Sequence, residues 1–116
     1  MQTIFHLSTC DTCRRILKNI EIPSAFKQQD IKKEPVSEAQ LEAMYKFTNS
    51  YEDLFNKRAQ LYRKRGLNKQ SLSESDYKEL LLEHYTFLKR PVIIDKDSIF
   101  VGNSKKNVAA LEAHFA

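Results

Sequence analysis

The chain has 116 residues, of which 41% are hydrophobic and 29% charged, and its formal net charge is +4. This length suits one domain with one core, and the hydrophobic content excludes wholesale disorder. No apolar run approaches the roughly 20 residues of a membrane-spanning helix, and the N-terminus lacks the basic segment of a signal peptide. We therefore expect a cytoplasmic protein with no membrane partner.

The first third of the chain is predicted to form a strand, a helix and a second strand. Residues 3–7 are a short apolar run typical of a buried strand. Residues 10–20 place apolar side chains on one stripe, which predicts a helix. Residues 25–31, bracketed by prolines, are predicted as a second strand from a weaker pattern.

The middle of the chain is predicted to be an all-helical insertion over about 36–88. Ser37, with Gln40 three residues later, has the form of a capping box, so we expect a helix over 37–47. A second, shorter helix is predicted over 50–55.

Two residues mark where helices end and begin in the rest of this insertion. Gly66 is interpreted as a helix stop or a turn, and Ser73 opens a helix that is predicted to run to about residue 88. His84, in apolar company on that helix, is interpreted as a packing or capping residue.

The last quarter of the chain returns to a strand pattern. Pro91 breaks the preceding helix, and residues 92–94 form a strongly apolar run that predicts a central strand. Residues 98–101 are expected to pair back as a hairpin, and Ser104 is expected to cap a final helix. The order is therefore β-α-β, a helical insertion, then β-β-α.

Cys10 and Cys13 are the only cysteines, and they lie at the start of the first predicted helix. Residues three apart share a helix face, with Cα atoms roughly 5–6 Å apart, which suits a disulfide. Unpaired N–H groups and partial positive charge at a helix N-terminus favour a thiolate. The pattern predicts a redox-active dithiol.

Three other interpretations of the pair stay open. A structural zinc needs about four N or S ligands, whereas the chain has no second cysteine pair and His6, His84 and His114 are scattered; we expect no metal. A structural disulfide closing so short a loop would add little stability. The two thiols could also be inert core residues.

Positive charge is densest between residues 56 and 65. This segment is interpreted as a solvated helical face, with an anion site or a contact for an acidic partner as the functional alternatives. No nucleic-acid-binding motif occurs, so no direct nucleic-acid partner is expected.

Three segments together resemble the ArsC/Spx/YffB family of arsenate reductase-like proteins over essentially the whole length. They are FHLSTCDTCR at 5–14, DLFNKR at 53–58 with YRK at 62–64, and LKRPVII at 88–94 with VG at 101–102. The resemblance implies one α/β domain over 1–116 with a thioredoxin-like fold, a mixed four-stranded sheet and the helical insertion. It also implies that Pro91 is cis and faces the cysteines.

The resemblance carries expectations for an anion site. Arsenate reductases of this family hold the oxyanion with three arginines, of which Arg90 matches one. Asn56 and Asn103 stand at the other two positions, with Arg58 close to the first, which argues against efficient arsenate reduction. Cys13 stands where arsenate reductases carry Ser and Spx-type members carry Cys.

We expect a thiol-dependent oxidoreductase in which Cys10 is the nucleophile and Cys13 resolves its adduct. Arg14 is expected to lean back toward Cys10, and Arg90 to supply a second positive charge that binds an oxyanion or a glutathione carboxylate. The remaining expected substrate-site or anion-site residues are Thr9, Thr12, Arg58 and Pro91.

The expected substrate is a small oxyanion or a glutathione or protein disulfide. No bound cofactor is expected, and the reductant is expected to be glutathione, a glutaredoxin or a thioredoxin. Two other functions stay open. One is a Spx-like redox-sensing regulator that binds RNA polymerase. The other is a catalytically silent interaction domain, in which Cys10 would keep an ordinary pKa.

Overall fold

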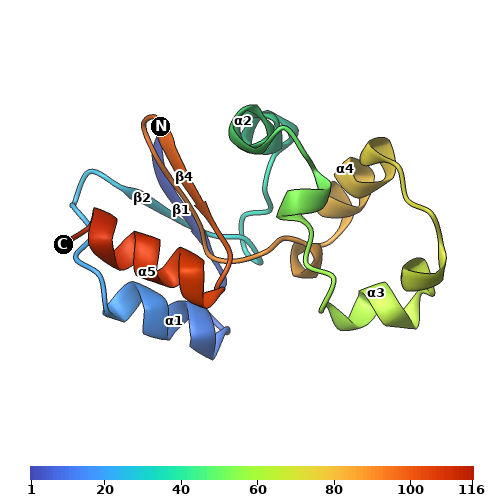
Figure 1. The fold of residues 1–116 in the computed structure, drawn as a ribbon, viewed down its shortest axis with the longest axis horizontal. Coiled ribbons are helices and arrows are strands. Elements are labelled where there is room, and N and C mark those ends of the chain that lie inside the picture. Colours follow the sequence, from blue (N-terminus) through green and yellow to red (C-terminus); the bar gives the residue numbers. More distant parts are fainter. The chain divides into compact units, whose positions relative to one another are not determined.

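The computed structural model describes all 116 residues, which divide into two units, Met1–Glu34 with Arg90–Ala116 and Pro35–Lys89. The first unit contains every strand of the sheet and two helices (Figure 1). Its elements are β1 (Gln2–His6), α1 (Asp11–Lys18), β2 (Lys27–Asp30), β3 (Val92–Asp95), β4 (Ser98–Val101) and α5 (Lys105–His114).

The four strands form one mixed sheet in the order β2-β1-β3-β4. β1 runs parallel to β2 and antiparallel to β3, with Ile4 opposite both Gln28 and Ile93. β3 and β4 form the predicted hairpin. The mixed four-stranded sheet and the central position of β3 are thus confirmed.

Helices α1 and α5 pack their apolar stripes against this sheet. Ile16 of α1 and Leu111 of α5 join Ile4 and Ile93 in one buried cluster. Burial of such side chains is the main favourable contribution to folding, at roughly 1.5–3 kcal/mol for each large aliphatic side chain. Helix α1 begins one residue later and ends two residues earlier than predicted, at Asp11 and Lys18.

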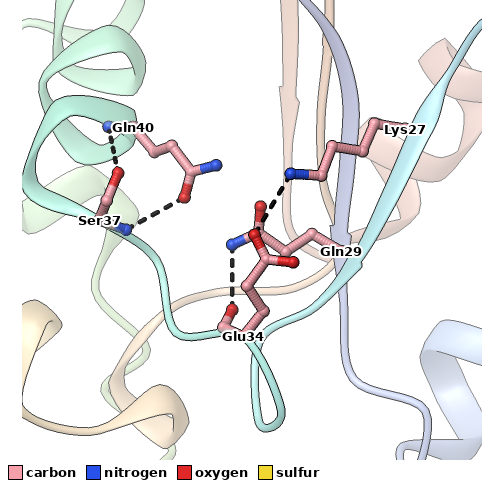
Figure 2. A network of polar contacts seen from close by, with 5 residues as sticks. All are labelled: Lys27, Gln29, Glu34, Ser37 and Gln40. Atoms are coloured by element: carbon pink, nitrogen blue, oxygen red, sulfur yellow. Dashed lines mark hydrogen bonds and ion pairs between the residues drawn. The ribbon is translucent and has the colours of Figure 1, made fainter.

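Strand β2 is polar, which explains its weak sequence pattern. Gln29 is nevertheless only 1% exposed, and its Nε2 donates a hydrogen bond to the Glu34 carbonyl at 3.0 Å (Figure 2). Lys27 pairs with the Glu34 carboxylate at 3.2 Å. Gln29 can therefore be buried in this polar strand at little cost in free energy, because a buried amide is costly only when its polar atoms lack partners.

The second unit consists of helices and connecting loops. Its only β-type pairing is an isolated bridge between Phe55 and Leu88. No helix of the protein is both long and apolar enough to cross a membrane. The elements are α2 (Glu38–Thr48), η1 (Glu52–Leu54), α3 (Gln60–Lys64), η2 (Leu67–Lys69), α4 (Glu74–Glu83) and η3 (Tyr85–Phe87), the η elements being 3-10 helices.

The capping box predicted at Ser37 and the helix start predicted at Ser73 are both confirmed. The Ser37 hydroxyl accepts from the Gln40 N–H at 3.1 Å, and the Gln40 side chain accepts from the Ser37 N–H at 3.0 Å (Figure 2). Ser73 and Asp76 make the same reciprocal pair at the start of α4, at 3.2 and 2.8 Å. Each pair satisfies two N–H groups that the helix itself leaves unpaired.

Two predictions for this unit were wrong, and one helix was missed. Helix α4 ends at Glu83 instead of continuing to residue 88, because His84 turns extended and its Nδ1 accepts from the Thr86 N–H at 3.1 Å. The capping interpretation of His84 is confirmed by the same contact. The predicted helix over 50–55 is only the short 3-10 helix η1, and α3 was not predicted. Gly66 follows α3 with a left-handed φ of +68°, as a helix stop requires.

Candidate active site

The two cysteines lie at the junction between β1 and α1. Cys10 is the N-cap of α1, and its N–H donates to the Leu7 carbonyl at 3.0 Å, which closes the turn between strand and helix. Cys13 lies in the first helical turn and is 0% exposed, whereas Cys10 is partly exposed. Both are free thiols. One sulfur is therefore open to a substrate and the other lies beneath the surface.

The surroundings of Cys10 favour its thiolate form. Partial burial raises the pKa of the Cys10 thiol, but hydrogen bonds from the Cys13 N–H and thiol, together with the charge and a hydrogen bond of Arg90, outweigh burial. The net pKa of Cys10 lies below its ordinary value. The contribution of the Cys13 N–H follows from the geometry of a helix N-terminus, where the first N–H groups have no carbonyl partner.

The surroundings of Cys13 have the opposite effect. Burial, which is the largest cause, and the neighbouring negative charge of Cys10 raise the pKa of Cys13 to about 12, against opposing contributions from the Leu7 N–H and Arg90. A thiol with this pKa is protonated at neutral pH, so it can donate a hydrogen bond to the Cys10 thiolate. The pair thus contains one acidic and one very weakly acidic thiol.

Arg90 reaches this junction from the segment before β3, and Pro91 follows it directly before that strand. The Arg90–Pro91 peptide is cis, as the family resemblance implied. The Pro91 carbonyl accepts from the Gly102 N–H at 2.8 Å, which ties the start of β3 to the end of β4. Arg90 hydrogen-bonds the Cys10 sulfur and is the arginine whose charge stabilises that thiolate.

Arg14 does not take the predicted position. Its guanidinium pairs with the Asp11 carboxylate, one turn earlier on α1, and its side chain is 63% exposed. Residues three apart on a helix face each other, so Asp11 offers Arg14 a full negative charge one turn away. The prediction that Arg14 points toward Cys10 is therefore wrong.

The other expected site residues are placed as follows. Thr9 lies exposed in the turn before Cys10. Thr12 lines a cleft between α1 and α5, together with Asn103, the residue at one of the expected arginine positions. Arg58 belongs to the second unit, where its N–H donates to the Asn56 side chain at 3.1 Å. Its role at the anion site stays a prediction.

Two features of this region were not foreseen from the sequence. The Ser8 hydroxyl donates to the Asp30 carboxylate at 2.5 Å, which links the loop before Cys10 to the end of β2. Arg15 and Glu112 line the cleft that also contains Thr12. These partners are too far apart in the sequence to form a recognisable motif. No group of three or more His, Cys, Asp or Glu side chains could hold a metal ion.

Known proteins resemble this chain over most of its length. The global transcriptional regulator Spx of Streptococcus agalactiae is 30% identical over 114 residues, which is 95% of this chain and 82% of that protein. A solved structure described as a possible arsenate reductase from Streptococcus mutans is 25% identical, with a TM-score of 0.72 over 90% of this chain and 92% of that one.

The arsenate reductase of Vibrio cholerae, at 18% identity, bears on the fold alone. Its TM-score is 0.73, and the match covers 95% of this chain and 96% of that one. The predicted thioredoxin-like fold is confirmed by these structural matches. The model of the ArsC family matches residues 5–111, and the chain therefore belongs to the ArsC family.

Proposed function

We propose that the protein is a thiol-disulfide oxidoreductase, with Cys10 as the nucleophile and Cys13 as the resolving thiol. The observation that carries the proposal is the placement of the two thiols. Cys10 is partly exposed at the N-terminus of α1, where Arg90 helps to lower its pKa, and Cys13 is buried, which raises its pKa. A low pKa at an accessible cysteine supplies the thiolate that thiol-disulfide exchange requires.

The proposed reaction has two exchange steps. The Cys10 thiolate attacks one sulfur of a substrate disulfide, forming a mixed disulfide and releasing a thiolate that takes up a proton from water. Cys13 then loses its proton and attacks the Cys10 sulfur, which releases the second substrate thiol after protonation. The substrate disulfide gains two electrons, and the enzyme is left with a Cys10–Cys13 disulfide.

Completion of the cycle needs an external dithiol or two monothiols, which become oxidised as the Cys10–Cys13 disulfide is reduced. Glutathione, a glutaredoxin or a thioredoxin is the proposed donor. Arg90 is proposed to orient a carboxylate or oxyanion of the substrate beside Cys10, because a guanidinium binds such groups with two parallel hydrogen bonds. Asn103 in place of an arginine favours a disulfide over arsenate as the substrate.

A turnover assay with purified protein tests the proposal. Glutathione disulfide and a mixed disulfide of a small peptide are supplied with a thioredoxin or glutaredoxin regenerating system, and arsenate is supplied in a parallel reaction. We expect disulfide reduction that is abolished in Cys10→Ser and reduced in Cys13→Ser. Turnover that persists in Cys10→Ser would refute the assignment of the nucleophile.

A second candidate function is a redox-sensing regulator that binds RNA polymerase. The 30% identity with a protein described as the global transcriptional regulator Spx, over 95% of the chain, favours it. In this case the Cys10–Cys13 pair would be a switch. A pull-down of RNA polymerase with the reduced and the oxidised protein separates the two candidates, since a regulator would retain polymerase in one redox state without thiol turnover.

A further inference from the structure

The turn that carries Cys10 starts at the edge of the sheet where β1 and β2 both end. The two strands run parallel, with His6 opposite Asp30, so their C-terminal ends lie at the same edge. The His6 carbonyl accepts a hydrogen bond from the Ile31 N–H at 2.9 Å. The chain just after β2 therefore holds the start of the turn, and three residues separate His6 from Cys10.

Asp30 is held in place by hydrogen bonds from several directions. Its carbonyl accepts from the N–H groups of Lys33 and Glu34 at 3.1 and 2.8 Å, and one carboxylate oxygen accepts from the Lys32 N–H at 3.1 Å. The other carboxylate oxygen accepts from the Ser8 hydroxyl at 2.5 Å, which is the largest cause of the lowered pKa of Asp30. The acceptor is thus a carboxylate at neutral pH, and a hydrogen bond to a charged group is roughly twice as strong as one between neutral groups.

The position of the Cys10 sulfur depends on this turn. Ser8 lies two residues before Cys10, and the turn closes where the Cys10 N–H donates to the Leu7 carbonyl at 3.0 Å. Ser8 is exposed, so its hydroxyl and not packing ties this part of the turn to the sheet. The Cys10 thiolate accepts hydrogen bonds from Cys13 and Arg90, and such bonds weaken steeply when donor and acceptor lose their alignment.

We infer that Asp30 is a positioning residue for the Cys10 thiolate and acts through the Ser8 hydroxyl. The bond between Asp30 and Ser8 fixes one end of the turn, and the first turn of α1 fixes the other. Between them the sulfur is held in line with the donors of Cys13 and Arg90. This role rests on the proposed function and adds the residues that set the reactivity of its nucleophile.

A purely electrostatic effect of Asp30 would have the opposite sign. A carboxylate near Cys10 disfavours the thiolate, so removal of its charge alone would lower the pKa of Cys10. Loss of the positioning bond would instead raise that pKa, because the thiolate would lose its alignment with its donors. The direction in which the pKa of Cys10 changes therefore separates the two roles.

The pH dependence of Cys10 alkylation in the reduced protein tests the role of the bond. Ser8→Ala is expected to move the midpoint of the profile to higher pH and to lower the rate below the midpoint about threefold, within the range for one net hydrogen bond. Ser8→Thr retains a hydroxyl and is expected to keep the original profile. If Ser8→Thr is as slow as Ser8→Ala, the hydroxyl is not the cause and the inference fails.

Charge variants test whether Asp30 acts through that hydroxyl. Asp30→Asn is expected to move the midpoint in the same direction as Ser8→Ala. The double variant is expected to be no slower than Ser8→Ala, because both changes remove one bond; additive losses would contradict this. Glu34→Gln is the matched control, since it also removes one negative charge but breaks only the ion pair with Lys27, and it is expected to leave the midpoint unchanged.

The outcomes distinguish this inference from the proposed function. If Ser8→Ala leaves the alkylation profile unchanged, or if Asp30→Asn lowers the pKa of Cys10, the positioning role fails, while disulfide turnover that depends on Cys10 stands. If Cys10→Ser turns over disulfide substrates as the original protein does, the proposed function fails, while the effect of Ser8 and Asp30 on Cys10 alkylation stands.

Discussion

Cys10 and Cys13 are expected to differ by orders of magnitude in their reaction with iodoacetamide. Only the thiolate reacts. Burial and the Cys10 charge raise the pKa of Cys13 from 9.0 to about 12, so at pH 7 about one Cys13 in 10⁵ is ionised, compared with about 1% for an ordinary cysteine. Folding therefore suppresses the Cys13 thiolate about a thousandfold, and its 0% exposure reduces access further.

Cys10→Ser and Cys13→Ser leave one thiol each, and the labelling rate of each variant is measured by mass spectrometry in buffer and in urea. Cys10→Ser removes one of the causes of the high pKa but leaves burial, the larger one, so Cys13 is expected to label at least a hundredfold faster in urea. Cys10 in Cys13→Ser is expected to label readily in the folded state. Comparable folded-state rates for the two variants would refute the division of roles.

Three further outcomes follow from the same structure. Arg90→Gln is expected to raise the pKa of Cys10. Arg14→Gln is expected to leave the pKa of Cys10 unchanged, because the Arg14 guanidinium binds Asp11. The pH dependence of Cys10 alkylation measures the pKa in both variants. Because the pKa of Cys13 is raised in the folded state, its contribution to stability is complete below pH 9 and is lost toward pH 12. Urea unfolding is expected to show that, above pH 9, the free energy of unfolding falls more steeply with pH in the original protein than in Cys13→Ala. The difference in slope is expected to reach about 1.4 kcal/mol per pH unit, and equal slopes for the two proteins would contradict this. Ser37→Ala, which removes the cap of α2, is expected to lower the free energy of unfolding by about 1 kcal/mol in the same assay.

Elements with strong local signals were predictable from the sequence. Ser37 and Ser73 carry complete capping boxes, and the apolar run before Asp95 requires a buried central strand. The end of α4 was not predictable from periodicity, because the His84 side chain offers the Thr86 N–H a competing acceptor. Helix α3 is a single short turn without buried residues, so it has no apolar stripe to detect.

The candidate site also contains some features that local sequence predicts and others that depend on distant contacts. The Cys10–Cys13 pair follows from a local strand-turn-helix pattern, whereas the contact of Arg90 with Cys10 joins residues eighty positions apart and entered only through the family resemblance. The pairing of Arg14 with Asp11 is an ordinary helical neighbour contact that competes with any more distant partner. The placement of Arg15 and Glu112 on one cleft depends on how α1 and α5 pack.

In the proposed two-step exchange, the repulsion between the two sulfurs has a consequence for the order of events. Part of what keeps Cys13 protonated is the negative charge on Cys10. A covalent bond between Cys10 and a substrate sulfur would remove that charge, and the pKa of Cys13 would then fall. On the proposed mechanism, the resolving thiol would therefore ionise more easily after the first exchange step than before it.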